Sequence, residues 1–163
     1  MDADCLIKLT KGGAKGEVSP CVDIAIPELV EIEAVEQGKE GGYPDSIEIE
    51  RNIRTGKIRV ERTSETEEVS HIAETLRLRG GEVKVYSMFH GGGFQAIASD
   101  DQKFMRKMEE IGVPCITPTA LIIHTWRRSM MEGERASELI ESMRPYVSEE
   151  EYILSKLEIE KGR

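Results

Sequence analysis

The chain alternates short apolar runs with amphipathic segments, and glycine or proline separates most of them. Residues 57–62 alternate polar and apolar side chains, which predicts a half-exposed edge strand. Short apolar runs predict three further strands, at residues 21–26, 94–98 and 113–116. Apolar residues at helical spacing predict helices over residues 4–11, 27–38, 44–56, 65–79, 102–111, 118–131, 134–143 and 148–161. Strands that alternate with helices indicate an α/β fold with a parallel sheet covered by helices on both faces.

Residues 82–90 fit two patterns. Val83 and Val85 alternate with polar residues, as in a strand, whereas Val85, Met88 and Phe89 share one face of a helix. The pattern alone leaves both structures open.

Length and composition favour a single domain over residues 1–163, with residues 134–163 as a helical extension packed on it. Apolar residues make up 39% and charged residues 33%, which is typical of a globular protein. No apolar run approaches the length that spans a membrane, so we expect no membrane association. The three cysteines form no CxxC pair, which favours a reducing, cytoplasmic setting and argues against a structural zinc site.

The formal net charge of −9 changes the choice of partners. Tight, nonspecific binding of nucleic acid relies on a basic surface, and this chain is acidic. A solvated acidic surface or a basic partner accounts better for the excess of carboxylates.

Two aspartates directly follow the predicted strand at residues 94–98. Ser99, Asp100 and Asp101 stand at its carboxyl end, the edge of an open α/β sheet where ligands bind. Any of the three could cap the helix that follows, which contributes about 1 kcal/mol. Because one cap suffices, one aspartate is left without a structural role.

Acidic residues at three earlier positions raise the same question. Glu33 falls within the apolar arc of its helix, where a lone carboxylate is unfavourable unless it is bound to a metal or held in a buried salt bridge. A partly exposed position at the rim of the apolar face is the third interpretation that the sequence leaves open. Asp4 could cap the helix 4–11, which leaves Asp2 over, and Glu82 could complement a helix dipole. Carboxylates gathered at one place repel one another, so together they predict a divalent cation and chemistry on a phosphate-containing substrate.

Taken together, these acids resemble the motifs of the PIN domain, a family of metal-dependent ribonucleases. Residues 2–7, with Asp2 followed by an apolar pair, are similar to its first motif. Residues 26–38, with Glu33 after a strand and a proline, resemble the second, and Gly81 with Glu82 resembles the third. Residues 98–104 resemble the fourth and most specific motif. The resemblance covers about residues 1–125.

The resemblance implies a three-layer PIN-like fold, a helix at residues 82–90, and cleavage of RNA phosphodiesters by one or two Mg²⁺ or Mn²⁺ ions. It implies single-stranded RNA as the substrate, and the further partners expected are an antitoxin-like protein and a second copy in a homodimer. The catalytic and metal-binding residues implied are Asp2, Glu33, Glu82 and Asp101, with Asp4 and Asp100 as further or alternative ligands. The substrate contacts expected are Ser99, Lys8, Lys11, Lys103 and Arg106.

Three features depart from the family pattern. Only Met1 precedes Asp2, whereas a PIN fold places this aspartate at the end of a central strand; the hypothesis is that apolar residues precede Met1 in the native protein, which its mass would reveal. Lys84 stands where many members carry another acid. Glu68 competes with Glu82 for the role of third acid.

Other functions remain open on the sequence. Asp2 and Asp4 followed by Cys5 are similar to the nucleophile motif of haloacid-dehalogenase-like phosphatases, although that reading gives Glu33 and Glu82 no role. A PIN-like chain could also be a catalytically weak or inactive interaction module, as Lys84 and the acidic surface suggest. A toxin of a toxin–antitoxin pair is a further form of the nuclease hypothesis.

Overall fold

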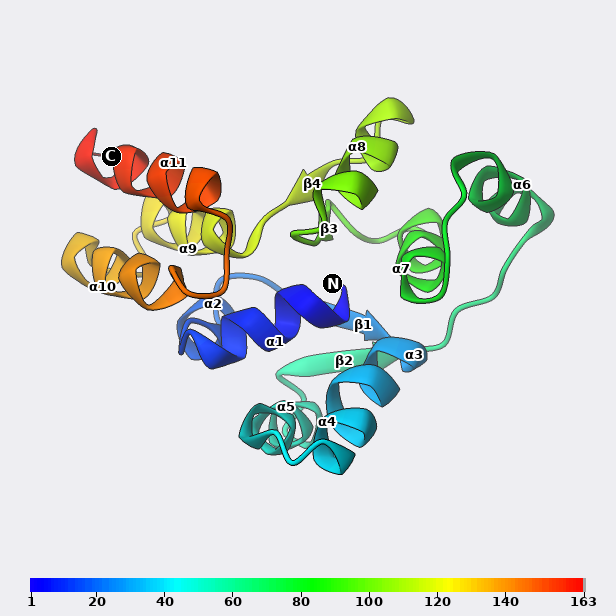
Figure 1. Ribbon diagram of the computed structural model, residues 1–163, viewed down its shortest axis with the longest axis horizontal. Helices are drawn as coiled ribbons and strands as arrows, with labels where there is room; N and C mark the ends of the chain where they lie inside the picture. The colour runs from blue at the N-terminus through cyan, green and yellow to red at the C-terminus, as the bar shows by residue number, and fades with distance from the viewer. Residues whose placement is uncertain (163) are drawn as a thin grey trace.

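The computed structural model describes residues 1–162, and helices make up most of it (Figure 1). Residue 163, the last of the predicted extension 134–163, lies outside the described residues. The strands are β1 (Ile24–Pro27), β2 (Ile58–Glu61), β3 (Ile97–Ala98) and β4 (Cys115–Ile116). The helices are α1 (Ala3–Lys11), α2 (Lys15–Val18), α3 (Glu28–Glu31), the π-helical segment η1 (Ile32–Glu36), α4 (Gln37–Glu40), α5 (Pro44–Arg54), α6 (Glu67–Leu76), α7 (Gly81–His90), α8 (Gln102–Glu110), α9 (Pro118–Arg127), α10 (Gly133–Met143) and α11 (Glu149–Glu160).

All predicted helices are present, and the ambiguous segment at residues 82–90 is the helix α7. Two helices end three or four residues earlier than the apolar pattern predicts, and α5 ends two residues early, at Arg54. The helix predicted to run to residue 79 ends at Leu76, because Arg77 adopts a left-handed conformation with φ of 53°. The helix predicted to run to residue 131 ends at Arg127, and Ser129 has a φ of 60°. The short helix α2 was not predicted.

The strands form two parallel pairs in place of the single predicted sheet. In one pair Ile24 of β1 lies opposite Ile58 of β2, and in the other Ile97 of β3 lies opposite Cys115 of β4. Only the last two residues of the predicted strand 94–98 join the ladder. The Ile97 amide donates a hydrogen bond to the Pro114 carbonyl. Proline has no amide hydrogen, so Pro114 cannot donate a bond in return. The fold is therefore mixed α/β, rich in helix with small parallel sheets, and the three-layer arrangement stays a prediction.

The first two residues join the two sheets. The Met1 ammonium donates a hydrogen bond to the Ala25 carbonyl in β1 at 2.9 Å, and the Asp2 amide donates to the Ala98 carbonyl in β3 at 3.0 Å. Burial lowers the pKa of the Met1 ammonium. These bonds fix Asp2 at the carboxyl end of β3, where α1 begins.

The core forms between α1, the strands and the C-terminal helices. The fully buried side chains include Leu6 and Leu9 of α1 and Ile140 of α10. Helices α10 and α11 pack on α9, and α10 also contacts α1 so closely that a Cβ on Gly12 would meet the Met143 sulfur at 2.2 Å. Among residues 1–162, no helix is both long and apolar enough to cross a lipid bilayer.

Candidate functional site

Acidic side chains from four segments line one pocket of about 220 Å³. Figure 1 shows the amino end of α1 near α7 and α3, and η1 and α8 supply the Glu33 and Phe104 that complete the lining of this pocket. The five acids that line the pocket are Asp2, Asp4, Glu33, Glu82 and Asp101. They come from positions separated by up to about a hundred residues, so the fold brings together the acids that the sequence singled out. We call these five residues the acid pocket.

Asp2 caps α1 and is the most deeply enclosed of the five. Its Oδ1 accepts a hydrogen bond from the Cys5 amide at 2.8 Å, which satisfies one of the free amides at the start of the helix. Burial raises the pKa of Asp2 to about 6, against the lowering effect of the hydrogen bonds from Ser99 and Cys5. The Asp100 charge raises this pKa further. A carboxylate in this environment gains most from a cation beside it.

Asp101 caps α8 with one oxygen and leaves the other free. Its Oδ1 accepts hydrogen bonds from the amides of Lys103 at 2.8 Å and Phe104 at 3.1 Å. Its own amide donates to the hydroxyl of the buried Ser99 at 3.1 Å. Within residues 1–162, Oδ2 accepts no hydrogen bond, so capping and ligand binding are compatible in this residue.

Glu33 lies in the π-helical segment η1. Burial raises its pKa, and the charge of Asp4 raises it further. No ion pair to Glu33 exists within the described part of the chain, so the salt bridge that the sequence left open is not seen there. The residue is half-buried, which agrees with the rim position that the sequence also left open. Gly81 makes room for the carboxylate, since a Cβ at this position would lie 3.3 Å from Glu33 Oε2. Single π-helical turns inside α-helices are often found at functional sites.

Glu82 is partly engaged by its neighbours. Its Oε2 accepts a hydrogen bond from the Arg79 amide at 3.1 Å and lies 3.5 Å from the Lys107 ammonium. Lys107 also donates to the Arg77 carbonyl at 3.3 Å and so connects α8 to the loop before α7. The competing third acid, Glu68, instead lies 3.4 Å from His90 and does not line the acid pocket.

Asp100 faces away from the acid pocket. It forms an ion pair with Lys8 and lines a separate, larger pocket of about 950 Å³ together with Arg106. Successive residues of an extended segment point in opposite directions, which explains why the two adjacent aspartates separate. Lys8 is therefore occupied by a carboxylate, whereas Lys103 forms no ion pair within residues 1–162.

The acid pocket offers the type of ligand that a divalent cation requires, but its side chains are not arranged around a common point. Carboxylate oxygens are the ligands that Mg²⁺ prefers, and two of the pocket carboxyl groups have pKa values raised by burial. Within residues 1–162, however, no three acidic, histidine or cysteine side chains lie close enough together to form a ready-made metal site. Side chains of the acid pocket would have to turn toward a common point to share an ion.

Sequence reasoning missed several residues of the pocket. Arg79 and Phe104 line it beside the acids. The position of Arg79, three residues before Glu82, gave no signal, because an arginine after a helix is ordinarily a solvated residue. Lys107 was missed for the same reason. Its role is visible only when α8 is seen to pack near the start of α7.

Comparison with known proteins identifies the family of the chain. The sequence matches the family DUF3368, described as a PIN domain, over residues 1–155. The comparison with curated proteins and the comparison with solved structures found no match. The family match spans all five residues of the acid pocket and nearly the whole chain. The chain therefore belongs to the PIN-domain family DUF3368.

Proposed function

We propose that this chain is an endoribonuclease that hydrolyses RNA phosphodiesters with Mg²⁺ or Mn²⁺ held at the acid pocket. The observation that carries the proposal is the convergence of Asp2, Glu33, Glu82 and Asp101 on one pocket. PIN domains are commonly nucleases, which agrees with such a pocket.

The pocket residues divide the work by their surroundings. Asp2 and Glu33 are the principal ligands, because burial leaves their charges least compensated by the protein. Asp101 offers its free oxygen, and Glu82 is positioned by the Arg79 amide. Asp4, on the exposed side of α1, is a further ligand. A bound metal ion in such a site lowers the pKa of a water molecule and stabilises charge on the leaving oxygen.

Ser99 has a supporting role in this proposal. It is fully buried, and its hydroxyl contacts both Asp2 and the Asp101 amide. It therefore holds two of the ligands in a fixed relation. Among the predicted cations, Lys11 and Lys103 are free to meet phosphates. Lys8 is paired with Asp100, and Arg106 lines the larger pocket.

The neighbouring aspartates provide a sharp test. Asp101→Asn keeps the helix cap but loses a charged ligand, so we expect metal-dependent cleavage of a labelled single-stranded RNA to fall about 100-fold, the effect of losing roughly 2.7 kcal/mol. Asp100→Asn is the matched control, because its side chain faces the other pocket and affects Asp2 only through its charge, the smallest of the effects on the Asp2 pKa. We expect it to cleave within about threefold of the parent. Equal cleavage by Asp101→Asn and the parent would contradict the proposal, as would a parent that is inactive with both metals.

An interaction module with weak or no activity is the second candidate. Two observations favour it: Lys84 pairs with Glu65 at 2.6 Å where a further acid is expected, and no ready-made metal site exists within residues 1–162. Calorimetric titration with Mn²⁺ separates the two functions, since an inactive module would bind none at millimolar metal. Under either function we propose a cytoplasmic single-domain protein, and an antitoxin-like partner or a homodimer as its assembly.

A further inference from the structure

One face of α1 leads away from the acid pocket. Asp4, Lys8 and Lys11 follow one another at positions i, i+4 and i+7, so they share a side of the helix. Asp4 and Lys11 are exposed, and Lys8 is half-buried. With a rise of 1.5 Å per residue, this stripe extends about 10 Å from the acid pocket to Lys11.

An exposed aromatic ring stands at the far end of the stripe. The Lys11 ammonium lies 5.3 Å from the centre of the Tyr43 ring, and Tyr43 is 56% exposed. The ring lies against the backbone of Gly41, where an added Cβ would meet ring carbons at 2.5 and 2.9 Å. The Tyr43 ring therefore packs against the Gly41 backbone at the surface, outside the core.

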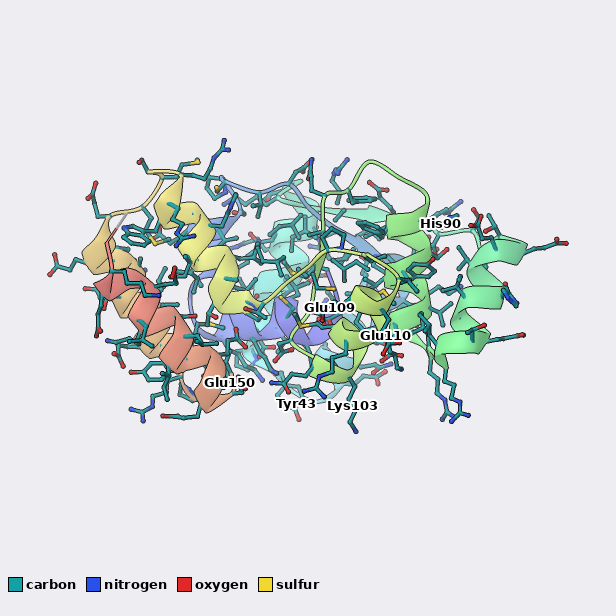
Figure 2. All side chains as sticks on the ribbon, turned by 90° about the horizontal axis from the view of Figure 1, so that it is seen from above. Tyr43, His90, Lys103, Glu109, Glu110 and Glu150 are labelled. Carbon is teal, nitrogen blue, oxygen red and sulfur yellow. The ribbon has the colours of Figure 1, made fainter. Side chains whose placement is uncertain are left out.

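Lys11 keeps its charge available. No carboxylate lies within ion-pair distance of Lys11 in residues 1–162, and its partner is the face of the Tyr43 ring. Lys103 is also free of ion pairs in the same part of the chain, and Figure 2 shows it on the same edge of the molecule as Tyr43. A free cation beside a fixed, exposed ring is the combination that holds a single strand, by a phosphate contact and a stacked base.

We infer that Lys11 and Tyr43 form a nucleotide-binding subsite for single-stranded RNA, at the end of the α1 stripe. The base stacks on Tyr43, and the Lys11 ammonium moves from the ring to an adjacent phosphate on its flexible stem. The inference rests on the proposed function for its choice of ligand. With a net charge of −9, the chain holds the strand at a local subsite and not on a broad basic surface.

Binding can be measured apart from cleavage. We would use the full chain carrying Asp101→Asn and a fluorescent oligouridylate of about ten nucleotides, and follow its anisotropy. Tyr43→Ala should weaken binding about 5- to 160-fold, the range of one base–aromatic stack, whereas Tyr43→Phe keeps the ring and should bind within about twofold. Lys11→Gln should weaken binding and reduce its salt dependence.

Tyr146→Ala is the matched control, because Tyr146 is another partly exposed tyrosine, 36% exposed, between α10 and α11. We expect it to bind as the parent does. Binding by Tyr43→Ala equal to the parent would overturn the inference. So would equal losses in Tyr43→Ala and Tyr146→Ala, or an Asp101→Asn parent that binds no oligouridylate.

Cleavage assays separate this inference from the proposed function. If the wild-type chain cleaves RNA and Tyr43→Ala leaves both KM and binding unchanged, the subsite is wrong and the nuclease stands. If the wild-type chain binds RNA through Tyr43 but cleaves none with Mg²⁺ or Mn²⁺, the nuclease is wrong and the subsite stands. Melting curves of each variant check that the fold is intact.

Discussion

The Asp2 carboxylate combines a structural role with a position in the acid pocket. Its carboxylate caps α1 and also lines the acid pocket, where burial raises its pKa to about 6. A raised pKa means that the folded chain binds this proton more tightly than the unfolded chain does. Ionised Asp2 is therefore a source of instability in the metal-free protein.

The pH dependence of stability tests this role. Between pH 4 and pH 7 the metal-free protein should lose about 2 kcal/mol of unfolding free energy through Asp2, because the folded form must release a proton as pH rises through about 6. In Asp2→Asn this contribution should vanish, since asparagine caps a helix equally well and does not titrate. Urea unfolding in a chelator measures the difference. Asp4→Asn, on the exposed side of the same helical turn, should keep the contribution of Asp2 and change the profile only through the smaller effect of Asp4 on Glu33.

Lys15 is a buried cation with no hydrogen-bond partner for its Nζ within residues 1–162. Burial, followed by the charge of Lys57, lowers its pKa to about 8. Because the pKa of this base is lower in the folded state, the charged lysine reduces the free energy of unfolding. This destabilisation decreases as pH rises from about 8 toward 10.5.

Lys15→Met should therefore raise the free energy of unfolding by about 1–3 kcal/mol at pH 7. The gain over the parent should shrink as the pH approaches 10, where the parent lysine is neutral in the folded state. Urea unfolding at both pH values measures this. A methionine variant that is less stable than the parent at pH 7 would mean that Lys15 has a partner which stabilises its charge.

At the scale of elements, the first turn of α7 shapes the acid pocket through an absent side chain. Gly81 begins α7, and a Cβ there would lie 3.3 Å from Glu33 Oε2. Alanine is more favourable than glycine in a helix by roughly 0.5–1 kcal/mol. Alanine at this position would therefore stabilise α7 but would displace the Glu33 carboxylate.

Gly81→Ala should therefore keep or raise the melting temperature while it weakens Mn²⁺ binding about 3- to 10-fold, as measured by calorimetric titration. Gly16→Ala is the matched control, because Gly16 also lies in a helix, α2, and a Cβ there would meet no atom within 4 Å. It should leave metal binding unchanged. Equal metal affinities for the two variants would show that Glu33 is not displaced or is not a ligand.

At the scale of the whole molecule, the apolar pattern predicted the helices well and the strands poorly. Helices such as α1 and α8 carry their signals locally, in an apolar stripe and a capping aspartate. Pairing of β3 with β4 depends on partners distant in sequence, so two residues at 97–98 formed a ladder where five were predicted. The division into two sheets could not be read from either strand alone.

The sequence predicted which acids would line the pocket but not which way their side chains would point. Asp2, Glu33, Glu82 and Asp101 converge as the sequence suggested, and Asp100 does not. The alternation of side chains along an extended segment indicates that Asp100 and Asp101 separate, but not which of them faces the pocket. The pairing of Asp100 with Lys8, ninety-two residues away, decides that and is invisible in the sequence.

The first two residues link the two sheets and also border the acid pocket, so ligand binding and the stability of the fold depend on the same place. The Asp2 amide is hydrogen-bonded to β3 while its carboxylate lines the acid pocket, and the adjacent Met1 ammonium is hydrogen-bonded to β1. An ion bound to that carboxylate would contact the residue that is hydrogen-bonded to β3 and that directly follows the residue bonded to β1. Binding at the pocket would thus stabilise the contact between the two strand pairs as well as the carboxylate itself.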